Sequence, residues 1–107
     1  MNQISVRQLH EMRQRGDSIY LVDVRQPWEH ELARLPDDIL VPLDQLADRS
    51  DEITPPAGAL VVTYCHHGIR SLNAAAILQQ LGHVNVASLA GGIDAWSQLV
   101  DPSVARY

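Results

Sequence analysis

The single cysteine of the chain, Cys65, lies in the stretch YCHHGIRS (64–71), where two histidines, a glycine, an arginine and a serine follow it. A thiolate is both a nucleophile and a metal ligand, whereas a buried thiol behaves as a small hydrophobe. The stretch therefore allows a reactive thiol in an anion-binding loop, half of a metal site, or a residue that merely ends a strand. Cys65, His66 and His67 cannot readily converge on one ion within a tight turn, so we expect no metal here.

The segments on either side of Cys65 favour the first interpretation. ALVVTY (59–64) is a continuous apolar run of strand length, and SLNAAAILQQLG (71–82) predicts a helix that Gly82 ends. Cys65 is therefore expected where a strand meets a helix, which is where open α/β sheets bind ligands. Backbone N–H groups at such a junction form an anion-binding nest, and Gly68 permits the crowded turn that this requires.

The strength of such a nest depends on how many groups converge. A helix N-terminus alone contributes about 0.3 to 1 kcal/mol, up to roughly 2 kcal/mol when partly buried. Because one pKa unit is about 1.36 kcal/mol, the helix end alone lowers the pKa of a thiol by only about one unit. Stronger activation needs several amides, helped by the charge of Arg70 or by the two histidines. We predict that Cys65 is mostly thiolate at neutral pH.

Length and composition define the class of protein. A chain of 107 residues with 46% apolar and 20% charged residues predicts one globular domain, residues 1–107. The net charge of -5, with eight arginines and no lysine, argues against a nucleic-acid partner. No apolar run reaches the roughly 18 to 20 residues of a membrane span, and no secretory signal is present, so we expect no membrane partner and a cytoplasmic location. One cysteine allows no internal disulfide, so thiol chemistry must involve another molecule.

The rest of the chain alternates between strand-like and helix-like segments. Runs rich in Val, Ile and Leu predict buried strands at IYLVDV (19–24), ILVPL (39–43), ALVVTY (59–64) and HVNVASL (83–89). Helices are predicted at VRQLHEMRQRG (6–16) behind the cap Ser5, after Pro27, at DQLADRS (44–50), at 71–82 and at IDAWSQLV (93–100). Such alternation favours an α/β fold whose parallel sheet is covered on both faces.

The stretch around Cys65 resembles the active-site loop of rhodanese-family sulfurtransferases, whose common form is Cys, two variable residues, Gly, one variable residue, Arg, Ser. The matching positions are Cys65, Gly68, Arg70 and Ser71, and the resemblance extends to DVR (23–25), LAGGI (89–93), Trp96 and DPSVARY (101–107). It covers nearly the whole chain and implies a rhodanese-like α/β fold, with a central, mostly parallel sheet of about five strands and helices on both faces. LPDDILVP (35–42) departs from the Gly-His-Ile-x-Gly-Ala of many members, so we expect a different turn there.

The resemblance implies a two-step transfer of sulfane sulfur without a cofactor. Cys65 would take sulfur from a small anionic donor such as thiosulfate, hold it as a persulfide, and pass it to a thiophilic acceptor, which is cyanide, a thiol or a protein. The backbone of Gly68, Ile69 and Ser71 would shape the cradle, and Arg70 would attract the donor. A cation in the first turn of a helix opposes the macrodipole, which independently indicates a function for Arg70.

Other polar and aromatic residues receive structural interpretations. His66 and His67 are expected at the rim of the loop, in contact with the donor or simply exposed. Asp23 and Arg25 are interpreted as an ion pair or loop hydrogen bonds at the end of another strand, which support the site from behind. A turn at 91–92 would let backbone approach the loop closely. Packing roles are predicted for Trp28 and Trp96, with a substrate contact as the alternative for Trp28. Surface or boundary positions are predicted for His10, His30 and His83.

Two other functions remain open. Cysteine-dependent phosphatases and arsenate reductases also place a cysteine in an amide nest, but they usually have five residues between cysteine and arginine. Here four residues, His66 to Ile69, separate Cys65 from Arg70, and the smaller ring suits a single sulfur better than a tetrahedral oxyanion. A persulfide carrier that docks on a biosynthetic partner would use the same intermediate and differ only in its acceptor.

Overall fold

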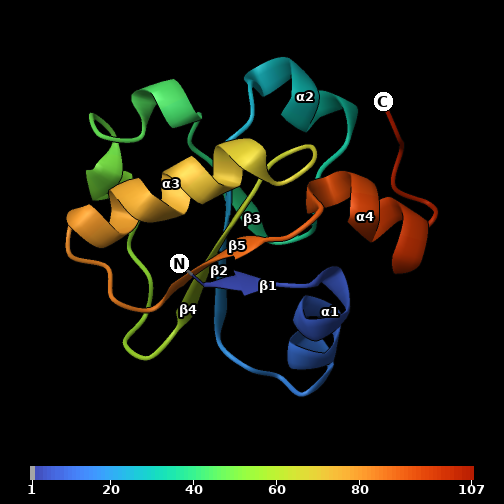
Figure 1. Ribbon diagram of the computed structural model, residues 1–107, viewed down its shortest axis with the longest axis horizontal. Coiled ribbons are helices and arrows are strands. Elements are labelled where there is room, and N and C mark those ends of the chain that lie inside the picture. Colours follow the sequence, from blue (N-terminus) through green and yellow to red (C-terminus); the bar gives the residue numbers. More distant parts are fainter. Residues whose placement is uncertain (1) are drawn as a thin grey trace.

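The computed structural model of the chain describes residues 2–107, in which parallel strands form one sheet in the order β1-β5-β4-β2-β3 (Figure 1). The strands are Gln3–Ile4 (β1), Ile19–Asp23 (β2), Asp38–Leu40 (β3), Leu60–Tyr64 (β4) and Val86–Leu89 (β5). The helices are Val6–Gln14 (α1), Pro27–Leu32 (α2), Ile69–Gln80 (α3) and Gly92–Leu99 (α4), with 3-10 turns at Leu43–Gln45 (η1) and Ser50–Glu52 (η2). The predicted α/β fold with a parallel sheet is confirmed.

Helices cover both faces of the sheet, so both faces are buried. Because successive residues of a strand point to opposite sides, each strand contributes to two separate clusters. On one face, Val61 of β4 belongs to a cluster that includes Leu78 of α3. On the other face, Val62 belongs to a cluster that includes Leu9 of α1 and Ile93 of α4. Figure 1 shows α3 lying along the sheet well apart from α1. Because β4 pairs with both β2 and β5, the strand that leads to Cys65 is central.

The sequence signals for the start of α1 and for the end of α3 are confirmed. The Ser5 hydroxyl accepts a hydrogen bond from the Gln8 N–H at 3.1 Å, and the Gln8 side chain accepts one from the Ser5 N–H at 2.8 Å. This reciprocal capping box fixes the start of α1, as predicted from Ser5. Gly82, with φ 105°, ends α3 as predicted, and the N–H of His83 binds the carbonyl of Leu78 at 3.0 Å.

Other element boundaries differ from prediction. The strand predicted at 83–89 covers only Val86–Leu89, because residue 83 closes the end of α3. The run at 39–43 forms strand only over Asp38–Leu40, although the N–H groups of Val41 and Leu43 still bind the carbonyls of Asp23 and Val24 at 2.9 and 3.0 Å. Pro42 is tolerated here because β3 is the edge strand of the sheet. The helix predicted at 44–50 is wrong: this region forms the short turns η1 and η2.

The turn before β3 is where the sequence departs from the common family pattern. Asp37 there has φ 62°, and it is the one non-glycine residue among 2–107 with a positive φ. Aspartate tolerates this left-handed conformation better than most residues. Within the same range of residues, no helix is both long and apolar enough to cross a bilayer.

Candidate active site

Cys65 follows β4 directly, at the carboxyl edge of the sheet, and is buried, with 1% of its surface exposed. Its Sγ accepts hydrogen bonds from the backbone N–H groups of Gly68, at 3.1 Å, and Ser71, at 3.3 Å. Gly68 is the N-cap of α3 and has φ 105°, a left-handed conformation that favours glycine. The loop thus directs the start of α3 at the sulfur, an arrangement that stabilises negative charge.

A pair of buried hydroxyl groups extends this environment. The Oγ of Ser71 lies 3.5 Å from the Sγ of Cys65 and 2.7 Å from the Oγ of Ser88 on β5. Either hydroxyl of this pair can donate to the other, so Ser71 can turn its proton toward a thiolate while Ser88 donates to Ser71. The backbone of Ser71 is held as well, because its carbonyl accepts from the Thr63 hydroxyl at 2.8 Å.

The start of α4 holds the loop that follows Cys65 through backbone hydrogen bonds. The N–H groups of Ile93 and Asp94 donate to the carbonyls of Cys65, at 2.9 Å, and His66, at 3.1 Å. A Cβ at Gly92 would come within 2.4 Å of the Cys65 carbonyl oxygen, a distance that no real Cβ tolerates. The predicted close approach of backbone at residues 91–92 is confirmed.

Arg70 is held by a carboxylate that sequence reasoning did not identify. Its Nη1 donates to Oε1 of Glu29 at 2.6 Å and its Nη2 to Oε2 at 2.9 Å. Those oxygens also accept from the Gln26 N–H at 3.1 Å and from the Tyr107 hydroxyl at 2.7 Å. Burial tends to raise the pKa of Glu29, but the bonds from Arg70, Tyr107 and Gln26 outweigh burial and lower it to about 2. Arg70 therefore faces an ionised carboxylate at neutral pH, which offsets part of its charge.

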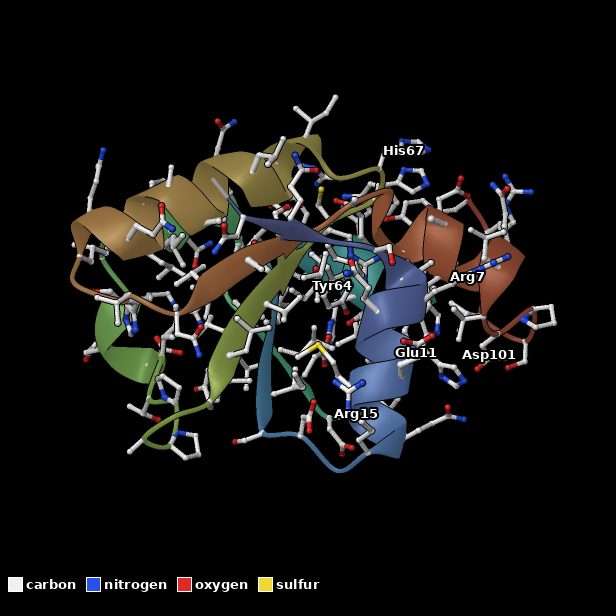
Figure 2. The ribbon with its side chains drawn as sticks, turned by 60° about the horizontal axis from the view of Figure 1, so that its bottom comes forward. Arg7, Glu11, Arg15, Tyr64, His67 and Asp101 are labelled. Atoms are coloured by element: carbon white, nitrogen blue, oxygen red, sulfur yellow. The ribbon has the colours of Figure 1, made fainter. Side chains whose placement is uncertain are left out.

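The two histidines stack at the rim of the loop. Their ring centroids are 3.9 Å apart, and His66 also stacks on Tyr107 at 3.9 Å with 8° between the ring planes. The pKa of His66 is lowered, first by burial and then by the neighbouring charge of His67. The side chain of His67 is 63% exposed, and Figure 2 shows it at the outer surface, whereas Tyr64 lies inside.

A group of possible metal ligands lies beside this stack. Ligand atoms of His66, His67 and Asp94 are within 4.8 Å of one another, so these are the residues of the rim that could hold an ion. The carboxylate of Asp94 is already bound by Arg106 at 2.9 Å and by Gln98 at 2.9 Å. Both donors compete with an ion for the same oxygens. The expectation that the site uses no metal stays a prediction.

Asp23 and Arg25 form the predicted ion pair, which is fully buried. The Nε and Nη2 of Arg25 each donate to a different carboxylate oxygen of Asp23 at 2.8 Å. Arg25 also donates to the Ala33 carbonyl at 2.5 Å and to the Tyr107 hydroxyl at 2.9 Å. Burial tends to lower the pKa of Arg25, but its bonds to Asp23 and Tyr107 outweigh that effect and raise it. Asp23 pairs with Tyr64 across the sheet, and Arg25 reaches the loop that follows Cys65 through Tyr107, which stacks on His66.

The prediction for the Trp28 side chain is wrong, and the one for His30 is incomplete. Trp28 is 61% exposed rather than packed, whereas Trp96 is buried as predicted. His30 lies at the boundary as predicted, with 19% of its side chain exposed, but its Nδ1 also lies 2.9 Å from the Oδ2 of Asp23, a contact that was not predicted. A carboxylate with two oxygens can serve Arg25 and a histidine together, and sequence spacing does not reveal this sharing.

Glu29 and Tyr107 are the residues of the site that sequence reasoning missed. A weak signal existed for Glu29, because it stands three residues after Gln26 with Pro27 between them, a spacing that fits a helix start with reciprocal capping. No local pattern indicated a role for Tyr107. Its contacts with Arg25 and His66 join segments that lie far apart in sequence.

Comparison with known proteins agrees with this geometry. The family described as Rhodanese-like domain matches residues 5–99. A sulfurtransferase from Allochromatium vinosum is 36% identical over 105 residues, covering 98% of this chain and 96% of that protein. The adenylyltransferase and sulfurtransferase uba4 from Ogataea parapolymorpha is 32% identical over 97% of this chain, and this chain spans 25% of its length.

Solved structures share the fold. A rhodanese-related protein from Thermoplasma volcanium has a TM-score of 0.83 at 26% identity, with 100% of both chains covered. The human single domain sulfurtransferase TSTD1 has a TM-score of 0.75 at 22% identity, covering 92% of this chain and 97% of that chain, which shows the fold alone. With the family match over residues 5–99, these findings show that the chain belongs to the rhodanese-like domain family.

Proposed function

We propose that this chain is a sulfurtransferase that carries a sulfane sulfur as a persulfide on Cys65. The observation that carries the proposal is the contact of the Cys65 Sγ with the N–H groups of Gly68 and Ser71 at the start of α3. Fixed dipoles that point at one sulfur stabilise a thiolate before transfer and a persulfide anion after it, by the logic of an oxyanion hole. Sulfurtransferase relatives within the same family support this function.

The first step loads the enzyme. The Cys65 thiolate attacks the outer sulfur of thiosulfate, a new S–S bond forms, and the bond between the two thiosulfate sulfurs breaks. The electron pair of the broken bond leaves with sulfite, and the negative charge of the thiolate passes to the outer sulfur of the persulfide. Charge and atoms balance without a redox partner or a cofactor.

The second step unloads it. A thiophile, cyanide or a thiolate, attacks the outer persulfide sulfur, and the electron pair of the S–S bond returns to Cys65 as thiolate. Arg70 contributes its positive charge at the mouth in both steps, although Glu29 offsets part of the long-range field. His67 is exposed at the rim, where it meets donor or acceptor without blocking Cys65. Asp23 and Arg25 support the site through Tyr107.

A protein acceptor is the second candidate for the unloading step. Ile69, within the catalytic loop, is 74% exposed, and Trp28 is 61% exposed. Large apolar side chains near a reactive group fit a partner surface rather than a small ion. The relative uba4 is named as both adenylyltransferase and sulfurtransferase, which is consistent with a domain that delivers sulfur to protein-linked chemistry. Slow transfer to cyanide with fast transfer to one protein thiol would identify this carrier function.

Intact-mass measurement after exposure to thiosulfate tests the proposal. We expect a gain of one sulfur, about 32 Da, in the wild-type chain and none in Cys65→Ser, with loss of turnover by at least about a thousandfold. Alkylation of the wild type with iodoacetamide beforehand should also prevent the gain. A wild type that hydrolyses phosphate esters through Cys65 and gains no sulfur would instead support a phosphatase.

A further inference from the structure

Tyr107 reaches the mouth of the site from the segment that follows α4. Figure 1 shows this segment running from α4 toward the side of the molecule where α2 lies. The Tyr107 ring stacks on His66 at 3.9 Å and meets the Trp28 ring edge-on at 6.0 Å. One side chain thus contacts both the catalytic loop and α2, which otherwise meet through Arg70 and Glu29.

The Tyr107 hydroxyl connects a cation to an anion. It accepts a hydrogen bond from Nη1 of Arg25 at 2.9 Å and donates one to Oε2 of Glu29 at 2.7 Å. Burial raises the pKa of Tyr107 to about 12, so the phenol keeps the proton that it donates. Arg25 is itself fixed by two bonds to Asp23, so the hydroxyl has a rigid anchor behind it.

The orientation of Arg70 depends on this connection. A guanidinium has five N–H groups in one plane, and Glu29 occupies one on each terminal nitrogen of Arg70. The plane and the free N–H groups of Arg70 are therefore set by where the Glu29 carboxylate lies. The hydrogen bonds to Glu29 do most to raise the pKa of Arg70. Arg70 directly precedes Ser71, whose N–H binds the Cys65 sulfur, so the guanidinium extends from the same first turn of α3 that faces the sulfur.

We propose that Tyr107 is a positioning residue for sulfur transfer: through Glu29 it orients Arg70, so that the unused N–H groups of the guanidinium meet an anionic donor at Cys65. This inference rests on the proposed function and adds a residue to it. Tyr107 is neutral, so its contribution is orientation rather than charge. Both hydrogen-bonding roles of its hydroxyl are already taken by Arg25 and Glu29, so it does not act as an acid or base toward substrate.

The Tyr107→Phe variant tests the proposal, because it removes the hydroxyl and keeps the ring on His66. In single-turnover loading followed by intact mass, we expect the half-saturating thiosulfate concentration to rise about three- to tenfold. The plateau rate should change by less than about twofold, because the Gly68 and Ser71 N–H groups that face the sulfur are untouched. Alkylation by iodoacetamide, which is uncharged, should proceed at the wild-type rate.

Tyr20→Phe is the matched control. The Tyr20 hydroxyl also bridges two groups, accepting from the Thr54 N–H at 3.0 Å and donating to the Glu52 carbonyl at 3.3 Å, away from Cys65. Its loss should lower stability without moving the half-saturating concentration. In an Arg70→Met background, Tyr107→Phe should have no further effect on loading, because the residue through which it acts is gone.

Each contrary result has a distinct meaning. An unchanged half-saturating concentration in Tyr107→Phe, an equal change in Tyr20→Phe, or a persisting effect without the guanidinium of Arg70 would overturn the positioning role. A lowered plateau with slower alkylation would show that the hydroxyl supports the fold of the loop instead. Failure of the wild type to gain sulfur would overturn the proposed function itself, so the two failures are separable.

Discussion

Two strand-to-helix junctions at the carboxyl edge of the sheet use the same backbone device for different purposes. Both helices begin after a glycine with positive φ, Gly68 before α3 and Gly91 before α4. In the junction between β4 and α3, N–H groups point at the sulfur of Cys65. In the junction between β5 and α4, N–H groups bind the carbonyls of Cys65 and His66. One helix start faces a side-chain sulfur, and the other holds the first in place.

The charged side chains in the first turns of α3 and α4 also differ between the two junctions. α4 carries Asp94 there, an anion that suits the positive end of a helix. α3 carries Arg70, which opposes the macrodipole and needs Glu29 beside it. A cation is locally unfavourable at that position, but under the proposed function it attracts the anionic donor. The comparison shows that a reactive junction carries a local electrostatic penalty, which a neighbouring element offsets.

Breaking the supporting junction should have the largest effect. We expect Gly92→Ala to lower the free energy of unfolding by about 3 to 4 kcal/mol, because its Cβ overlaps the carbonyls of Cys65 and His66 as well as forcing a left-handed alanine. The loading rate at low temperature, where the variant stays folded, should fall at least about tenfold as the loop shifts. Urea unfolding and intact mass measure the two effects.

Gly16→Ala is the control for this substitution. Gly16 also has positive φ, at 78°, but a Cβ there meets nothing within 4 Å. It should lose only the conformational part, about 1 to 2 kcal/mol, and keep full activity. Equal losses in both variants would mean that the α4 start does not press on the loop.

Low pH should destabilise the junction between β4 and α3 by protonating Glu29. Its folded-state pKa of about 2 lies below the ordinary 4.5, so the bonds from Arg70 and Tyr107 stabilise the fold fully above about pH 4.5. That stability, about 3 kcal/mol, is lost as the pH falls from 4.5 toward 2. We expect Glu29→Gln to flatten this part of the curve of unfolding free energy against pH. Asp94→Asn, at the junction between β5 and α4, should flatten the curve less, because Asp94 pairs with Arg106, whose side chain is exposed.

A smaller effect is expected at the hydroxyl pair behind the sulfur. Ser71→Ala removes the hydroxyl that lies 3.5 Å from the Cys65 Sγ, so the loading rate should fall about three- to tenfold. Ser88→Ala removes only the partner hydroxyl and should slow loading less, with a similar loss of stability. A larger effect on loading from Ser88 than from Ser71 would contradict the direct contact.

Sequence reasoning succeeded where the signal is local. The apolar run before Cys65, the Ser5 cap and the stop at Gly82 each predicted an element that the structure contains. The tight loop at Gly68 and the close approach at 91–92 were also predictable, because glycine is the residue that both geometries demand.

Sequence reasoning failed where contacts join segments that are distant along the chain. β1 was not predicted, because two residues, Gln3–Ile4, give no periodicity of their own and exist as strand only by pairing with β5. Glu29 received no prediction, and its partners Arg70 and Tyr107 come from distant parts of the chain. Spacing along the chain does not encode such meetings.

The order of these contacts along the chain has a consequence for biosynthesis. Ile93, Asp94 and Tyr107, which brace the loop from outside, all follow Cys65 in sequence. As the chain emerges from the ribosome N-terminus first, the thiol is exposed before the residues that brace it exist. The loop that follows Cys65 therefore gains its full set of contacts only when residues 92–107 have folded back, and until then the sulfur lies on a nascent chain without them.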